Sequence, residues 1–325
     1  MKPRILTGDR PTSSQFHLGN YLGTLKNRVE LQDEYDIFIM LADLHALTTH
    51  AQSPQHIKQN SEELVLNYLA VGIDPGKVTI FVQSHTLIPQ LALILGMFTP
   101  VSMLERQPAL KEKLDQGSNA TYGLLGYPVL MAADILGPRA NVVPVGKDQK
   151  AHVEFARDIA QKFNSLFGET FTIPEPLIGE GGTLVGTDGK QKMSKSLNNA
   201  IFLLDDEQTV KEKVMKMYTD PTRIRPTDLG HVEGNPVFIY HDFFNANKEE
   251  VAELKQRYGA GMVSDVEVKE KLVAALNKFL APIRERYATL RAKGDIVGDI
   301  LAQGDARAKI VISETLESVK QAMGM

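Results

Sequence analysis

The stretch RILTGDRPTSSQFHLGN, residues 4–20, decides the fold. Its start, Arg4–Thr7, is a short apolar run that predicts a strand, and a helical pattern follows over His17–Gln32. The turn-rich segment between them contains Gly8, and Gly19 opens the helix, so the backbone can approach a ligand closely at both places. In a parallel nucleotide-binding sheet this is the crevice where a helix N-terminus offers N–H groups to phosphate. An ordinary strand-turn-helix with a surface histidine is the alternative interpretation.

The first half of the chain continues this alternation of strands and helices. Further strands are expected at Ile37–Leu44, Val78–Gln83 and Asn141–Val145. Further helices are expected at Ser53–Val71, Tyr127–Leu136 and Asp148–Phe167. Strands that alternate with crossover helices imply a parallel sheet, so the sequence predicts an α/β protein with a Rossmann-like, doubly wound fold.

The strand signal fades after Gly181–Asn199, a segment rich in Gly, Lys, Ser and Asn that predicts a mobile surface loop. The remaining pattern is mostly helical, with helices expected at Asp206–Met217, Lys248–Tyr258, Ser264–Leu290 and Asp305–Met323. We therefore expect a Rossmann-like domain over residues 1–204, with the Gly/Lys/Ser-rich segment at its end, and a C-terminal helical domain over residues 205–325. The last helix is expected to pack back on the first domain.

Composition excludes several classes of protein. The 325 residues include no cysteine, which rules out disulfides, thiolate zinc sites and a cysteine nucleophile. No apolar run approaches the roughly 20 residues that a membrane span needs, and the first residues lack the apolar centre of a signal peptide. A cytoplasmic protein with no membrane association is expected. The net charge of −4 argues against a surface that binds polyanions everywhere, but allows a local basic patch.

A second chemical motif, Lys192-Met193-Ser194-Lys195-Ser196, lies in the Gly/Lys/Ser-rich segment. Two lysines three residues apart, flanked by hydroxyls, can clamp a polyphosphate and neutralise charge as pyrophosphate leaves. A solvated basic loop without a specific role is the alternative interpretation, since exposed lysines are common.

Together, His-Leu-Gly-Asn at 17–20 and Lys-Met-Ser-Lys-Ser at 192–196 resemble the two signature motifs of class I aminoacyl-tRNA synthetases. Residues 127–136 and 143–149 are similar to segments of the tryptophanyl-tRNA synthetase family, and the similarity continues into Gly304–Lys309. The resemblance implies an ATP-dependent ligase that converts L-tryptophan to tryptophanyl-adenylate and transfers it to the 3′-terminal adenosine of tRNA(Trp). It also implies a homodimer, and an anticodon-binding role for the helical domain with its arginines and lysine, Arg284, Arg286, Arg291, Arg307 and Lys309.

The resemblance assigns roles to residues of this sequence. The catalytic residues are His17, Lys192 and Lys195. The ATP-binding residues are Arg10, Pro11, Thr12, Gly19, Asn20, Gly146, Lys147, Asp148, Leu184, Lys192, Met193, Ser194, Lys195 and Ser196. The tryptophan-binding residues are Asp134, Tyr127, Gln149, Met131, His45, Val143 and Val145.

Within the tryptophan group, Asp134 is expected to accept the indole N–H, because a desolvated carboxylate rejects side chains that lack a donor. Tyr127 and Gln149 are expected to hold the ammonium group, and the remaining residues line the slot. For Met131 and the two valines ordinary core packing is the alternative interpretation, and for His45 it is a structural histidine. For Asp134 the alternative is an aspartate on a helix face that only caps or pairs locally. No protein metal site is expected, and Mg²⁺ would be bound through the ATP phosphates and waters.

Three other functions remain open. Tyrosine specificity is one, because tyrosyl enzymes share the class and a related aspartate. An auxiliary paralogue that senses tryptophan or nucleotide and charges tRNA weakly is another. Its motivation is the first motif, where Ser13 replaces a family glycine and Pro11 to His17 is one residue longer than the family pattern. A nucleotidyltransferase without a tRNA substrate is disfavoured by the helical domain and the complete lysine motif.

Overall fold

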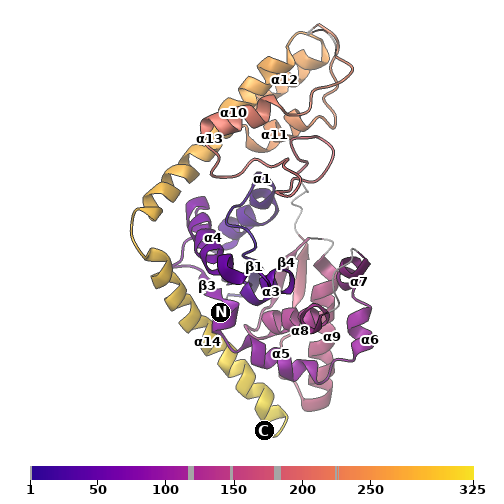
Figure 1. Ribbon diagram of the computed structural model, residues 1–325, viewed down its shortest axis with the longest axis vertical. Helices are drawn as coiled ribbons and strands as arrows, with labels where there is room; N and C mark the ends of the chain where they lie inside the picture. Colours follow the sequence, from indigo (N-terminus) through magenta and orange to yellow (C-terminus); the bar gives the residue numbers. More distant parts are fainter. Residues whose placement is uncertain (1, 116–120, 147–148, 179–183, 224, 226) are drawn as a thin grey trace. The chain divides into compact units, whose positions relative to one another are not determined.

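The computed structural model describes residues 2–115, 121–146, 149–178, 184–223, 225 and 227–325 (Figure 1). The chain forms two compact units. Unit 1 comprises Met1–Ser14, Asn27–Glu180 and Lys293–Met325, whereas unit 2 comprises Gln15–Lys26 and Gly181–Ala292. These limits differ from the boundary expected at residue 205. The short segment 15–26 groups with the later part of the chain, and the C-terminal helix groups with unit 1.

Unit 1 is built around a parallel sheet. Among the described residues, the strands are β1 (Arg4–Asp9), β2 (Asp36–Leu41), β3 (Thr79–Val82), β4 (Val142–Val145) and β5 (Glu175–Ile178). Their order is β3-β2-β1-β4-β5, and every pair is parallel. The chain therefore turns back between β1 and β4, which is the switch point of a doubly wound sheet. The predicted Rossmann-like fold class is confirmed.

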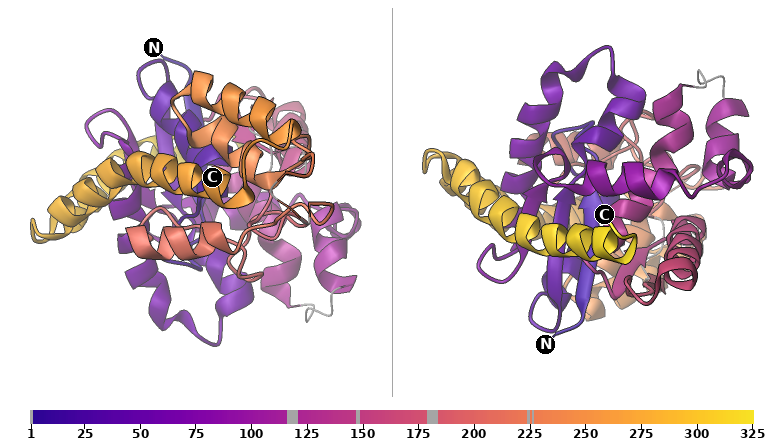
Figure 2. Two further views of the ribbon diagram at one scale, coloured as in Figure 1. Left: turned by 90° about the horizontal axis from the view of Figure 1, so that it is seen from above. Right: turned by 90° about the horizontal axis from the view of Figure 1, so that it is seen from below.

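Helices of unit 1 connect these strands. They are α2 (Lys26–Leu31), α3 (Asp43–His50), α4 (Ile57–Val71), α5 (Ile88–Gly96), α6 (Val101–Glu105), α7 (Pro108–Asp115), α8 (Tyr122–Leu136), α9 (Lys150–Phe167) and α14 (Ile296–Ala322). Because parallel crossovers are right-handed as a rule, the strand order predicts that the connections on the two sides of β1 place their helices on opposite faces of the sheet. In Figures 1 and 2, α14 runs alongside the sheet of this unit, where it packs on β3.

The sheet is held by apolar side chains that alternate along its strands. Phe38 and Met40 of β2 belong to a core cluster with buried residues of α5, α8, α9 and α14. Ile37 and Ile39 are also buried, and their positions in a strand direct them to the opposite face. The sheet is therefore covered on both faces. Burial of each of these side chains contributes about 1.5–3 kcal/mol to the free energy of unfolding.

Three local differences from the expected elements have clear physical causes. The strand expected to reach Leu44 ends at Leu41, because Asp43 accepts a hydrogen bond from the Leu44 amide at 3.0 Å and begins α3. β5 was not expected, since it is short and contains Pro176, which a strand accepts at a sheet edge. The helix expected at Tyr127 begins at Tyr122, where the Thr121 hydroxyl caps it.

Unit 2 is mostly helical. It contains α1 (Leu18–Asn20), a π-helical turn η1 (Tyr21–Leu25), α10 (Glu207–Met215), α11 (Pro236–Phe244), α12 (Lys248–Gly259) and α13 (Asp265–Arg291). Tyr21 packs its ring on Phe279 of α13, with ring centroids 5.0 Å apart, so the segment 15–26 joins the same core. The helical character expected for residues after 205 is present up to α13.

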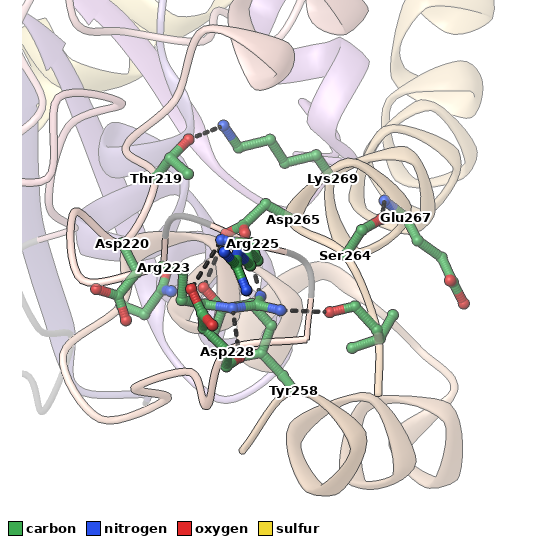
Figure 3. A network of polar contacts seen from close by, with 12 residues as sticks. Thr219, Asp220, Arg223, Arg225, Asp228, Tyr258, Ser264, Asp265, Glu267 and Lys269 are labelled. Carbon is green, nitrogen blue, oxygen red and sulfur yellow. Dashed lines mark hydrogen bonds and ion pairs between the residues drawn. The ribbon is translucent and has the colours of Figure 1, made fainter. Parts of the chain in front are cut away.

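A buried polar network holds unit 2 together (Figure 3). The guanidinium of Arg223 bonds Asp265 at 3.1 Å and lies 4.1 Å from the ring centroid of Tyr258. The ammonium group of Lys269, which is also buried, donates to the Met217 carbonyl at 2.7 Å and to Thr219 at 2.8 Å. Burial lowers the pKa of Lys269. Lys269 thus supplies a partner for the Met217 carbonyl, and Arg223 supplies one for the Val263 carbonyl at 2.8 Å. Both carbonyls lie outside helices, so these bonds fix residues 217–223 beside α13.

Candidate functional site

His17 is the N-cap of α1, and this role determines which of its nitrogens carries the proton. Its Nδ1 accepts from the Asn20 amide at 3.2 Å, while the Asn20 side-chain oxygen accepts from the His17 amide at 3.0 Å. This reciprocal pair is a capping box. Because Nδ1 acts as an acceptor, the neutral ring carries its proton on Nε2. The sequence therefore places an imidazole N–H donor at the start of the helix.

The His17 ring is kept neutral. Its partial burial, reinforced by the positive charge of Lys192, lowers the pKa of His17 to about 4. At pH 7 the ring is thus a dipolar donor rather than a cation. The lysine motif supplies the positive charge in the same unit.

Within the segment predicted as a mobile surface loop, the lysine motif forms part of a short hairpin. Val185 and Lys192 form an antiparallel bridge, and the Gly186 amide donates to the Gln191 carbonyl at 2.7 Å. Thr187 and Asp188 are the central residues of the turn, which the Gly189 amide closes by donating to the Gly186 carbonyl at 3.0 Å. Gly189 has a φ of 69°, which favours glycine. Residues 181–183 of the expected loop lie outside the described part of the chain.

Within the motif, apolar and charged residues are separated. Met193 is buried and its amide donates to the Leu184 carbonyl at 2.9 Å, whereas Lys192 and Lys195 are exposed. The Ser194 and Ser196 hydroxyls lie 2.9 Å apart. The hairpin is therefore anchored by Met193 and leaves both lysines accessible to a ligand.

The two signature motifs lie side by side in unit 2. The Gly19 amide donates to Met193 Sδ at 3.3 Å, and the Leu18 amide donates to the Ile201 carbonyl at 2.9 Å. His17 and Phe202 form an antiparallel bridge. A Cβ at Gly19 would lie 3.1 Å from the His17 ring and 3.5 Å from Met193 Cβ. A glycine thus suits this position, where the start of the helix meets the lysine hairpin.

Asn199 holds the lysine motif in place and was not predicted from the sequence. Its side-chain oxygen accepts from the Ser194 amide at 2.8 Å. Its amide nitrogen lies 3.1 Å from an Asp188 carboxylate oxygen and 3.3 Å from the Lys192 carbonyl. Asn199 is buried, and a Cβ on Gly186 would lie only 2.1 Å from its nitrogen. A buried asparagine therefore ties Lys192 and Ser194 of the lysine motif to the hairpin turn at Asp188.

The first loop, residues 10–14 in unit 1, is anchored by helix α4. The Asn60 side chain donates to the Pro11 carbonyl at 3.0 Å, and Asn67 donates to the Ser14 carbonyl at 3.3 Å. Among the described residues, Arg139 and Asn198 are the non-glycine residues with positive φ. Ser13 consequently carries no left-handed strain, and the extra length of this loop is accommodated by bonds to α4.

A buried ion pair fixes the end of β1 immediately before this loop. The Arg28 guanidinium bonds Asp9 at 2.5 Å and Thr7 Oγ1 at 3.1 Å. The Tyr68 hydroxyl donates to the same Asp9 oxygen at 2.8 Å. Arg10 and Thr12, the predicted ATP residues that follow, are exposed and half-buried respectively, and Pro11 is buried.

Asp134 of α8 is the centre of the predicted tryptophan group in unit 1. It is 2% exposed, and its two oxygens bond His45 Nε2 at 2.7 Å and Gln83 Nε2 at 2.6 Å. Since the carboxylate only accepts, Nε2 of His45 carries a proton. Each oxygen retains a lone pair for a further donor. The buried charge is thus paired and hydrogen-bonded, as burial requires.

Aromatic and apolar side chains surround this carboxylate. Tyr127 lies two turns before Asp134 on α8, and its ring centroid is 6.5 Å from His45 and 5.8 Å from His152. Burial raises the pKa of Tyr127 to about 12, so its hydroxyl stays protonated. Met131, on the same side of the helix, is half-buried. The α-helical spacing of these three residues gathers the predicted amino-acid contacts on one face.

The end of β4 supplies the remaining predicted residues. Val143 is buried and Val145 half-buried in the core cluster that also contains Leu6, so packing is at least part of their role. Gly146 and Gln149 are exposed, and the Gln149 amide donates to the Gly146 carbonyl at 3.0 Å. Lys147 and Asp148, both predicted to bind ATP, lie outside the described residues.

Gln83 is the second residue that the sequence did not reveal. It is fully buried at the end of β3 and bonds Asp134, yet nothing in the local pattern distinguishes it from an ordinary strand terminus. Of the basic residues predicted for the helical domain, Arg284 bonds Asp205 and Asn277 in unit 2. Arg307 instead belongs to unit 1, where it pairs with Asp36 at 2.6 Å.

The described residues contain no group of three or more histidine, aspartate or glutamate side chains that could hold a metal ion. No helix in the described part of the chain has the length and apolarity needed to cross a bilayer.

Comparison with known proteins identifies the class. The family model of class I tRNA synthetases for W and Y matches residues 1–281. A tryptophan–tRNA ligase of Treponema pallidum is 51% identical, with 99% of this chain and 97% of that protein covered. A tryptophan–tRNA ligase of Borreliella burgdorferi is 49% identical, with 100% of this chain and 95% of that protein covered.

A solved structure of tryptophanyl-tRNA synthetase from Campylobacter jejuni, complexed with ADP and tryptophan, has a TM-score of 0.90 to this chain at 37% identity. It covers 99% of this chain and 100% of its own. The parallel sheet and the paired signature motifs are those of a class I aminoacyl-tRNA synthetase. Within that class, the chain belongs to the tryptophanyl-tRNA synthetase family.

Proposed function

We propose that this protein is a tryptophan–tRNA ligase that activates L-tryptophan with ATP and esterifies it to tRNA(Trp). The observation that carries the proposal is the buried carboxylate of Asp134, fixed by His45 and Gln83 beside the Tyr127 ring. The tryptophan–tRNA ligases that cover the whole chain support the choice of amino acid.

The buried carboxylate provides selection by hydrogen bonding. The indole N–H occupies a remaining lone pair of Asp134, while an apolar side chain without a donor leaves that buried charge short of a partner. Tyr127 and Gln149 hold the ammonium group, and Met131, Val143 and Val145 line the indole slot. Sites that hydrogen-bond a substrate donor reject analogues that lack it by factors of about 10⁴–10⁵, so no editing domain is required.

Activation requires no enzyme nucleophile. The tryptophan carboxylate attacks the α-phosphorus of ATP, so that a new O–P bond forms while the bond from the α-phosphorus to the bridging oxygen of pyrophosphate breaks and pyrophosphate leaves. The neutral His17 donates from Nε2 to a phosphate oxygen, and Lys192 with Lys195 neutralises charge that develops on the pyrophosphate. The remaining predicted ATP residues position the nucleotide, so catalysis rests on orientation and electrostatics.

Mg²⁺ accompanies ATP in this proposal. The described residues gather no set of side chains that could hold a cation by themselves. The cation would be bound by phosphate oxygens and water, which is typical of magnesium at nucleotide sites. It would neutralise phosphate charge, while the residues above bind and orient the substrates.

Transfer to tRNA and assembly complete the proposal. The aminoacyl group moves from the adenylate to the 2′-hydroxyl of the terminal adenosine, with release of AMP. The helical part of unit 2 contacts the tRNA through exposed cations, and α13 carries Arg286 and Arg291 as exposed candidates. A cytoplasmic location is part of the proposal, because tRNA charging occurs there.

A homodimer is also proposed. Leu93 and Met97 lie one turn apart at the end of α5, and Val101 begins α6; all three are exposed apolar side chains. We take these side chains, which are close together in the sequence, as part of the proposed contact between the two copies. Sedimentation should show a dimer for the wild type. The Met97→Asp variant places a charge in the proposed contact and should dissociate at micromolar protein concentration. A monomeric wild type would refute this assembly.

Aminoacylation of purified tRNA(Trp) tests the function, with ATP–pyrophosphate exchange measured on the same preparation. Both activities are expected with tryptophan. Exchange without charging would instead support an auxiliary paralogue. Neither activity, with ATP and tryptophan still bound, would favour a sensor and refute the ligase.

A further inference from the structure

The segment Gly304–Lys309, singled out in the sequence, places α14 against β3. A Cβ on Gly304 would lie 1.8 Å from the Ile80 carbonyl oxygen, so only glycine allows the helix to approach the strand backbone this closely. β3 is an end strand of the sheet, and one of its backbone donors is satisfied from α14. The Val82 amide donates to Asp305 Oδ1 at 2.8 Å.

The second oxygen of Asp305 extends the contact beyond the strand. Asp305 Oδ2 lies 2.6 Å from His85 Nδ1. Asp305 consequently bonds residues 82 and 85, which flank and end the 3₁₀ turn Gln83–His85. One carboxylate thus fixes this turn from both sides.

Gln83, inside that turn, has only one possible orientation. Its oxygen accepts from the amides of Leu44 at 3.1 Å and His45 at 3.4 Å, at the start of α3. Its nitrogen must therefore face Asp134, to which it donates at 2.6 Å. The other Asp134 oxygen bonds His45, so the orientation of the carboxylate is determined by His45 and Gln83 together. These two residues are also bonded to each other, through the His45 amide and the Gln83 side-chain oxygen.

We propose that Gln83 and Asp305 are positioning residues for amino-acid selection. Asp305 holds the turn, and Gln83 holds both the Asp134 carboxylate and the start of the helix that carries His45. The inference rests on the proposed function, in which Asp134 accepts the indole N–H. Recognition groups must be held to within about 0.5 Å of the productive geometry, so a loosened turn weakens this hydrogen bond without altering ATP contacts.

The test compares two variants of the same helix. Asp305→Ala removes the bonds to the turn. Arg307→Ala is the matched control, because it removes another docking bond of α14, the ion pair with Asp36 at 2.6 Å, and leaves the turn intact. ATP–pyrophosphate exchange gives the KM for tryptophan and for ATP and the preference for tryptophan over tyrosine. Thermal melting confirms that each variant is folded.

Asp305→Ala should raise the KM for tryptophan about tenfold, the effect of one lost hydrogen bond, and Gln83→Ala at least as much. The KM for ATP should stay within about twofold for both, and Arg307→Ala should change neither constant by more than about twofold. If Asp305→Ala does not fold, Asp305→Asn is measured in its place. Asparagine retains an oxygen for the Val82 amide and loses the carboxylate oxygen that bonds His85, so the tryptophan KM should rise about threefold.

A double variant tests whether the two residues act through the same turn. Gln83→Ala with Asp305→Ala should be no worse than Gln83→Ala alone, because the carboxylate has already lost its neighbour. The inference would be overturned if the increases in tryptophan KM multiplied in the double variant, or if Asp305→Ala and Arg307→Ala had equal effects. It would also be overturned if Asp305→Ala left the tryptophan KM unchanged. A wild type that prefers tyrosine would refute the proposed function instead, and the same contrast measured with tyrosine would still decide the positioning role.

Discussion

Replacement of Asn199 by alanine should impair adenylate formation without impairing tryptophan binding. Asn199 makes three hydrogen bonds that fix the lysine hairpin: from the Ser194 amide at 2.8 Å, to Asp188 at 3.1 Å and to the Lys192 carbonyl at 3.3 Å. Alanine removes all three bonds. It touches neither the indole pocket residues nor the two lysine side chains.

The magnitude follows from these bonds. Two neutral hydrogen bonds at about 1 kcal/mol each and one to a carboxylate at about 2 kcal/mol give roughly 4 kcal/mol. Water recovers part of this, since much of the hairpin is exposed, which leaves roughly 2–3 kcal/mol. If this energy holds Lys192 and Lys195 in place in the transition state, kcat falls roughly 30- to 150-fold at 1.36 kcal/mol per tenfold.

Single-turnover adenylate formation with saturating tryptophan and ATP measures this loss directly. Leu197→Ala, two residues away and exposed, is the matched control and should stay within about twofold of wild type. The reasoning is refuted if Asn199→Ala lowers kcat less than about threefold. It is equally refuted if the KM for tryptophan rises in parallel with the loss of kcat.

Three further predictions concern residues named from the sequence. Asp134→Ala leaves the His45 and Gln83 donors without an acceptor and should raise the tryptophan KM about 100-fold in exchange kinetics, while comparable loss for ATP would contradict the assignment. Lys195→Ala should lower kcat for adenylate formation about 100-fold with KM nearly unchanged, and small equal effects on both would exclude a transition-state role. The pKa of His17, about 4, lies below its ordinary 6.5, so kcat/KM for ATP should show no inflection from His17 between about pH 5.5 and 8. The same shift predicts that stability falls as pH drops from about 6.5 towards 4, because only the unfolded chain binds the proton there; equilibrium unfolding of His17→Asn should show a weaker fall, and an equal one would refute the shift.

The sheet could be predicted from the sequence to the extent that its strands are apolar runs. β1 to β4 were recognised because a strand buried on both faces has few polar residues. β5 escaped because its Leu177 and Ile178 are exposed and Pro176 interrupts the pattern, so neither alternation nor a continuous apolar run is present. The division into units could not be predicted either, since residues 15–26 join unit 2 through contacts such as Tyr21 with Phe279.

The candidate site shows the same distinction between local and long-range information. His17, Asp134 and the lysine motif were found because short motifs contain them. Gln83 and Asn199 act through hydrogen bonds to residues that only the fold or a hairpin brings near, and each is a single amide in an unremarkable segment. Positioning residues of this kind become visible only when the donors and acceptors of a buried group are counted.

The most direct test of the central claim is ATP–pyrophosphate exchange with tryptophan and tyrosine in parallel, on the wild-type protein without tRNA. We expect robust exchange with tryptophan and a lower kcat/KM for tyrosine. The tyrosine hydroxyl is also a donor, but it lies at a different distance from the amino-acid backbone than the indole N–H that Asp134 is proposed to bind. Exchange that is faster with tyrosine, or absent with both amino acids, would contradict the central claim.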